Sequence, residues 1–145
     1  MTALVNHEQA GALALAQFDG PDDAERQLLT QPQTELPLAH HFGPGVYIRE
    51  MYAPAGTLVV GHRHKGAMTN ILLKGALLLA GPNGLQRIDA PALFVSPPGR
   101  KMAYVLEDMI FQNVMATELT NLDQIEDAFI EKSQAWLEHH GVTEK

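Results

Sequence analysis

The central part of the chain, residues 35–118, is a succession of short segments in which apolar and polar residues alternate, separated by turns rich in glycine and proline. Alternation with a period of two is typical of strands that bury one face. Many short strands joined by tight turns predict an antiparallel sandwich or barrel. The expected strands are Leu36–Phe42, Val46–Tyr52, Thr57–His64, Thr69–Leu73, Ala76–Ala80, Leu85–Ile88, Ala92–Ser96, Ala103–Leu106 and Met109–Thr117.

The two ends of the chain follow a helical pattern instead. Residues 1–34 predict a helix that ends near Phe18 and a second, shorter helix that begins at Pro21 or Asp22. This segment is either a helical cap on the barrel or an arm that contacts another chain, and the pattern leaves both interpretations open. Residues 119–145 predict one amphipathic helix over 120–139, with Thr120 and Asp123 at its start. We expect it to pack on its own barrel, although it could also dock on a neighbouring subunit.

Composition narrows the classes of function. A length of 145 residues predicts one domain with appendages. The formal net charge of −7 argues against direct binding of nucleic acid. There is no run of 18 apolar residues, so no membrane-spanning segment is expected. The chain has no cysteine, which excludes disulfides, thiolate metal sites and a cysteine nucleophile.

Two histidines, His62 and His64, stand two residues apart in an expected strand and therefore share one face. An Fe, Mn or Zn site needs three or four nitrogen and oxygen ligands, whereas the continued alternation brings in Met68, whose thioether suits only Cu(I). One interpretation is an inert interior filled with methionine. The other is a metal centre with further ligands from Asn70, Tyr104 or Gln112.

The spacing around these histidines resembles the first motif of the cupin family, G-x5-H-x-H-x3–4-E-x6-G. Gly56, His62, His64 and Gly75 match it, and Met68 stands where the glutamate belongs. Both glycines are expected at turns. The resemblance implies an all-β fold, a double-sheet antiparallel jelly roll, here with helical segments at the N- and C-termini.

The second cupin motif, G-x5-P-x-G-x2-H-x3-N, is matched by Pro97 and Gly99 only, because Met102 replaces its histidine and Leu106 its asparagine. Cupins include metal-dependent dioxygenases, isomerases and decarboxylases, together with members that have no catalytic activity. Two of the four usual metal ligands are missing. We therefore expect a vestigial metal site at His62 and His64, no cofactor and no enzymatic activity.

The stretches 43–51, 55–61 and 96–101 resemble small cysteine-free cupin-like proteins of tailed bacteriophages. That resemblance implies a virion protein, made in the host cytoplasm, that acts as a capsid cement or decoration protein. Its partners would be the major capsid protein and further copies of itself in a homo-oligomer. The alternative is a cupin enzyme or small-ligand binder with one transition metal at His62 and His64. The expected partner contacts are Leu13, Leu15, Phe18 and a basic rim that includes Arg100 and Lys101.

Overall fold

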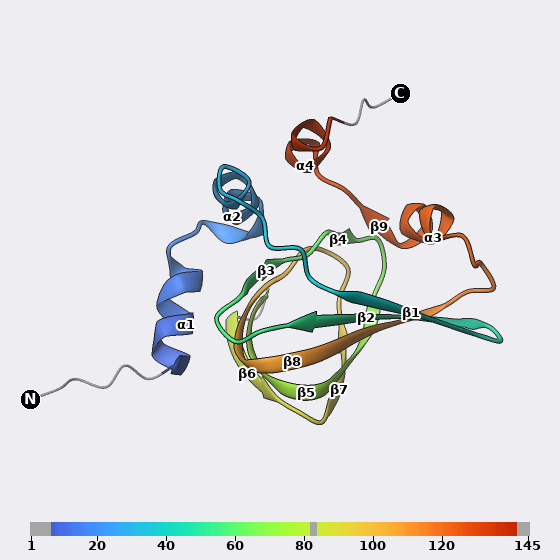
Figure 1. Ribbon diagram of the computed structural model, residues 1–145, viewed down its shortest axis with the longest axis horizontal. Helices are drawn as coiled ribbons and strands as arrows, with labels where there is room; N and C mark the ends of the chain where they lie inside the picture. The colour runs from blue at the N-terminus through green and yellow to red at the C-terminus, as the bar shows by residue number, and fades with distance from the viewer. Residues whose placement is uncertain (1–6, 82–83, 142–145) are drawn as a thin grey trace, which may run out of the picture.

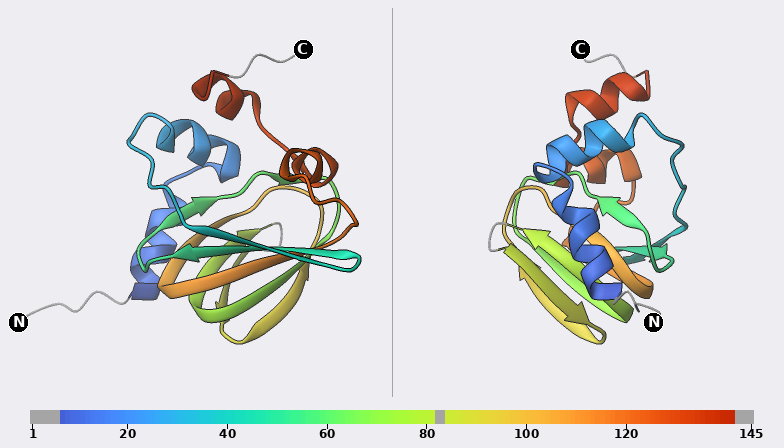
Figure 2. Two further views of the ribbon diagram at one scale, coloured as in Figure 1. Left: turned by 45° about the vertical axis from the view of Figure 1, so that its right-hand side comes forward. Right: turned by 90° about the vertical axis from the view of Figure 1, so that its left-hand side faces the viewer.

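The structure, a computed structural model, describes residues 7–81 and 84–141. A curved β-barrel forms its centre, and helices lie along one side and over one end (Figures 1 and 2). The elements in chain order are α1 (His7–Ala16), α2 (Gly20–Leu28), β1 (Leu38–Gly43), β2 (Val46–Ala53), β3 (Leu58–Val60), β4 (Arg63–His64), β5 (Met68–Gly81), β6 (Gly84–Asp89), β7 (Ala92–Ser96), β8 (Met102–Ala116), α3 (Leu122–Phe129), β9 (Ile130–Glu131) and α4 (Gln134–His139).

Two long strands, β5 and β8, belong to both halves of the barrel. In one half, β2 pairs with the last part of β8 and β7 with the first part of β5. In the other half, β3 pairs with the start of β8 and β6 with the end of β5. All of these pairings are antiparallel. The expected double-sheet jelly roll is therefore confirmed.

The strand boundaries differ from the prediction in three places. The strands expected at 69–73 and 76–80 are one strand, β5, and those expected at 103–106 and 109–117 are one strand, β8. The strand expected at 57–64 is divided into β3 and β4. In each case the chain bends without reversing, and a local pattern of apolar residues cannot distinguish a bend from a turn.

Gly75 provides the bend in β5. The register between β5 and β8 shifts between Leu72 and Leu77, and Gly75 has a φ of 90° at that place. Residues with a side chain rarely adopt this conformation. Gly56 lies at a turn as expected, with a φ of 89°. Gly75 does not, because it lies inside a continuous strand.

Helices α1 and α2 pack on the outer side of this chain's own barrel. Leu15 on α1 is 3% exposed and Ala24 on α2 is fully buried, in one cluster with Leu78 of β5 and Leu106 of β8. Phe18 is half-buried against the same cluster. Leu15 is thus a core residue, which corrects its expected role as a surface contact, and Leu13, 72% exposed, is the large apolar residue of α1 that remains on the surface.

The helix expected over 120–139 is broken into α3, β9 and α4. Asn121, one residue after the expected cap, begins α3 by accepting a hydrogen bond from the backbone N–H of Gln124 (3.0 Å). Ile130 is extended and pairs with His64 of β4, so β9 interrupts the helix. Ser133 then caps α4 by accepting from the backbone N–H of Trp136 (3.1 Å). None of the helices between residues 7 and 141 that the structure describes is long and apolar enough to cross a membrane.

Candidate functional site

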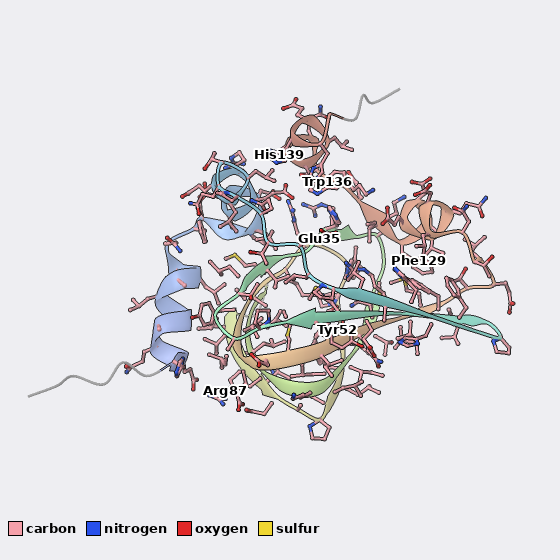
Figure 3. All side chains as sticks on the ribbon, viewed as in Figure 1. Glu35, Tyr52, Arg87, Phe129, Trp136 and His139 are labelled. Atoms are coloured by element: carbon pink, nitrogen blue, oxygen red, sulfur yellow. The ribbon has the colours of Figure 1, made fainter. Side chains whose placement is uncertain are left out.

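The barrel encloses a cavity of about 470 Å³. Its walls are mainly the inward-facing side chains of β2, β3, β5 and β8, and residues of α3 and α4 line it at one end. Figure 3 shows Trp136 between α4 and this end of the barrel, and the Trp136 indole meets the His62 ring edge to face at 5.2 Å. A cavity of this size is ordinary for the binding of a small molecule.

The strand register explains which side chains line the cavity. Arg49 of β2 lies opposite Asn113 of β8, and Asn113 lies opposite Asn70 of β5. These three residues form a polar row across neighbouring strands. The next inward-facing row, two residues along each strand, is apolar: Met51 and Phe111 line the cavity, and Leu72 beside them is fully buried. The cavity therefore has a polar band beside an apolar wall.

The two asparagines of the polar row are held by hydrogen bonds. The Asn113 side-chain amide donates to Asn70 Oδ1 (2.8 Å), and the Asn70 amide donates to Ser96 Oγ (3.1 Å) and to the carbonyl of Met68 (3.1 Å). Lys101 Nζ also donates to Ser96 Oγ (2.6 Å). Because Asn70 already uses its oxygen and its amide within the protein, it is not available as the further metal ligand considered above.

Arg49 differs from its neighbours in this row. Within residues 7–81 and 84–141 its guanidinium has neither a hydrogen bond nor an ion pair, although the side chain is half-buried in the cavity. Burial lowers the pKa of Arg49, and the nearby Tyr47 and Glu126 raise it. An arginine stays protonated under such conditions because its ordinary pKa lies far above neutral pH. A positive charge with five hydrogen-bond donors therefore lies unpaired in the barrel.

His62 and His64 both line the cavity, as the alternation predicts. The Nδ1 atoms of both rings are buried and have no hydrogen-bond partner. Burial lowers the pKa of His64 to about 4, and the charges of Lys101 and Arg49 act in the same direction. Burial also lowers the pKa of His62, with a further contribution from Arg100. Both imidazoles are thus neutral near pH 7.

The residues around these histidines do not fit the metal that the first motif implies. Within the described part of the chain, no group of three or more His, Asp or Glu side chains is placed to hold a metal ion. Met68, 2% exposed, occupies the interior where the motif has its glutamate. The cations Arg49 and Lys101 line the same cavity and repel a metal ion. The surroundings of His62 and His64 suit an anion better than a metal.

The depressed pKa of His64 has a measurable effect on stability. Unfolded His64 binds a proton near pH 6.5 and the folded protein only near pH 4, so between these values the unfolded state holds more protons. We expect the free energy of unfolding to fall by about 1 kcal/mol between pH 7 and pH 5 on account of this residue, after allowing for its partial exposure. Urea unfolding at a series of pH values measures the slope. His64→Gln should flatten it, and an unchanged slope in that variant would show that His64 is not buried in its neutral form.

The other expected site residues are placed differently from the prediction. The Arg100 side chain, 5% exposed, binds Glu25 and Asp22 of α2, and the half-buried Lys101 lines the cavity. They do not form an exposed basic rim. Gln112 lies outside the barrel and donates to Glu50 Oε1 (2.6 Å). Tyr104 packs under Gly11 of α1, so neither it nor Gln112 reaches the histidines.

Among the cavity residues that sequence reasoning did not assign to the site are Tyr47, Arg49 and Trp136. Tyr47, Arg49 and Met51 alternate along one expected strand, and a charged residue on a face otherwise formed by Tyr47 and Met51 was the available signal. Tyr47 is 2% exposed, and its hydroxyl forms a 2.6 Å hydrogen bond with His40 Nδ1. Trp136 had no such signal, because its position depends on the break between α3 and α4.

No protein-family model and no curated protein matches this chain. Solved structures do match. KdgF from Halomonas sp. has a TM-score of 0.51 at 14% identity, covering 64% of this chain and 88% of that one. An RmlC-like cupin family protein with a double-stranded β-helix fold from Methanocaldococcus jannaschii has a TM-score of 0.47 at 16% identity, covering 59% and 84%. A cupin domain from Bordetella pertussis has a TM-score of 0.45 at 17% identity, covering 60% and 98%. Similarity at this level concerns the fold and says nothing about activity.

Proposed function

We propose that this cupin-fold protein binds a small organic anion inside its barrel. The observation that carries the proposal is the unpaired guanidinium of Arg49 within the cavity. An unpaired charge away from water is costly, and such a charge is retained where a ligand of opposite charge pairs with it. A carboxylate is the natural partner, since the guanidinium fork matches it with two parallel hydrogen bonds.

The electrostatics of the cavity support the same proposal. The charged side chains that line it are Arg49, Lys101 and Glu126, so cations outnumber the one carboxylate. The chain as a whole has a formal net charge of −7. A positive interior in an acidic protein is not a consequence of overall composition. The buried Nδ1 atoms of His62 and His64 add polar groups that a bound ligand or water can satisfy.

The proposal is one of binding and not of catalysis. It replaces the metal-dependent alternative expected for His62 and His64 with a metal-free site in which the same two residues face the ligand. With Glu126 as the one carboxylate among the described lining residues, the cavity has no pair of acids for acid–base chemistry.

The test is thermal unfolding in the presence of sodium acetate, succinate, benzoate and octanoate, each compared with sodium chloride at the same ionic strength. A ligand at one hundred times its dissociation constant stabilises the folded state by about 2.7 kcal/mol. We expect at least one of these carboxylates to raise the unfolding temperature in a saturable manner. Arg49→Met should abolish that rise, and because it removes an unpaired buried charge the variant should remain folded.

Arg63→Met provides the matched control. Arg63 is an exposed arginine on β4, beside His64 in sequence, and does not line the cavity. This variant should respond to the carboxylates as the wild type does. Equal responses in Arg49→Met and the wild type, or no response of the wild type to any of the four, would refute the proposed function.

A second candidate function is that of a structural virion protein that binds a capsid shell, as the resemblance to phage proteins implies. It is supported by apolar side chains on the outer surface of β5 and β7, where Leu93 is 68%, Val95 64% and Leu73 49% exposed. Exposed apolar residues that gather in this way are typical of interaction surfaces. Sedimentation of the wild type and of Leu93→Glu, alone and with empty phage heads, tests it. A cement protein should sediment with the heads, and Leu93→Glu should lose this association. A wild-type protein that stays monomeric and does not sediment with the heads would contradict this function.

A further inference from the structure

Resting on the proposed function, we infer that the ligand is an amphipathic monocarboxylate, with its carboxylate at Arg49 and an apolar body against the inner wall of the barrel. The inference comes from the order of polar and apolar rows along β2 and β8. Arg49 and Asn113 are followed on the same strands, two residues away, by Met51 and Phe111. A ligand that fills the cavity therefore meets a charge in one row and hydrocarbon in the next.

The most favourable place for an anionic group in the cavity is beside Arg49. Arg49 has no hydrogen bond or ion pair within the described residues, whereas Lys101 Nζ spends one of its three donors on Ser96 Oγ. Glu126 of α3 lines the cavity and is close enough to influence the charge of Arg49. A second carboxylate on a ligand held at Arg49 would lie near the carboxylate of Glu126, which is itself paired with Lys132 Nζ (2.8 Å). Like charges in such a site cost free energy, so a dianion should be disfavoured.

The apolar part of the wall offers no partner for a second polar group. Met51, Leu77 and Met109 are each less than 10% exposed, and Leu79 and Phe111 complete the same surface. Neither leucine nor methionine supplies a strong hydrogen-bond donor or acceptor. A polar group placed there would lose its hydration without replacement, while a hydrocarbon chain gains about 25 cal/mol for each Å² removed from water.

Trp136 and Phe129 extend the apolar surface to the open end of the barrel. Figure 3 shows both residues at that end, on α4 and α3 respectively. The mouth therefore accepts the hydrocarbon part of a ligand as well as the wall does. A hydrocarbon chain longer than the inner wall can therefore extend past these two side chains, under α4.

Isothermal titration of the full chain with three probes tests the inference. Octanoate has one carboxylate and a hydrocarbon chain, octylamine has the same chain with a positive charge, and succinate has two carboxylates and little hydrocarbon. We expect octanoate to bind at least tenfold more tightly than succinate, and octylamine to show no saturable binding. Arg49→Met should weaken octanoate binding by at least tenfold, and Arg63→Met should leave it unchanged.

The other outcomes separate this inference from the proposed function. If succinate binds as tightly as octanoate and its binding depends on Arg49, the proposed anion site is supported, but the inference that the ligand is an amphipathic monocarboxylate is wrong. If octylamine binds as well as octanoate, the cavity recognises hydrocarbon alone, and both statements are wrong. Absence of binding by all three probes overturns both as well.

Discussion

Replacement of Gly75 by alanine is expected to destabilise the barrel by about 4 kcal/mol, a sum of backbone strain and steric overlap. The φ of 90° at Gly75 is unfavourable for any residue with a side chain. A Cβ atom at this position would lie 2.4 Å from the carbonyl oxygen of Asp108 and 2.8 Å from that of Glu107, both in β8. Backbone atoms cannot move aside as the end of a flexible side chain can, so the bend in β5 must shift.

Gly56→Ala provides the control for this prediction. Gly56 has nearly the same φ, 89°, but the nearest atom to a Cβ there is the Tyr104 hydroxyl at 3.9 Å. Its substitution should cost only the backbone strain, about 1–2 kcal/mol. Chemical denaturation of the two variants measures both values. Equal losses would mean that β5 does not pack closely against β8 at its bend.

Replacement of Arg100 by methionine is expected to cost about 3–5 kcal/mol, because it leaves a buried carboxylate without its partner. Arg100 binds Glu25 through both terminal nitrogens and Asp22 through Nη1, and its Nε donates to the carbonyl of Gly61 (2.7 Å). Burial alone raises the pKa of Glu25, but hydrogen bonds from Arg100 and from Ser133 outweigh it and hold the pKa below its ordinary value. Glu25 is therefore charged and depends on Arg100.

The comparison for Arg100 is Arg87, which joins α1 to β6 through Glu8 and Asp89 with similar distances but is 40% exposed. Arg87→Met should cost much less than Arg100→Met, as is usual for ion pairs in contact with water. The double variant Arg100→Met with Glu25→Leu should recover most of the loss, since it removes both charges together. A similar cost for Arg100→Met and Arg87→Met would show that Glu25 is not isolated from solvent.

The Arg100 cluster also connects stability to the proposed site. Ser133, which donates to Glu25, caps α4, and α4 carries Trp136 over the open end of the cavity. Helix α2, the barrel and α4 thus meet at one buried ion pair. A variant that loosens this cluster should also loosen the mouth of the cavity, whereas substitution of Arg87 should not.

The barrel itself could be predicted from sequence, because strand alternation and turn residues are local signals. The same alternation placed His62, His64, Met68 and Asn70 on the inner face, and the structure agrees. The break of the last helix could not be predicted in this way. It depends on the pairing of Ile130 with His64, two residues far apart in the chain, and tertiary contacts of this kind override local helix propensity.

The character of the site was predicted only in part. The missing metal ligands were evident from Met68 and Met102, yet the residue that gives the cavity its charge, Arg49, lies outside both motifs. Its position opposite Asn113 follows from the pairing of β2 with β8. It lacks a partner because, among the described residues, the fold brings no carboxylate within ion-pair distance of its guanidinium. A local pattern contains neither fact.

The measurement that tests the anion site most directly is the side-chain Nε–Hε resonance of Arg49 in ¹H–¹⁵N NMR spectra, assigned by its absence in Arg49→Met. During titration with sodium octanoate, the resonance should move in a saturable manner as the guanidinium forms hydrogen bonds with the carboxylate. Sodium chloride at the same ionic strength should leave it unmoved. A resonance that stays in place while octanoate binds would contradict the assignment of Arg49 as the anchor of the ligand.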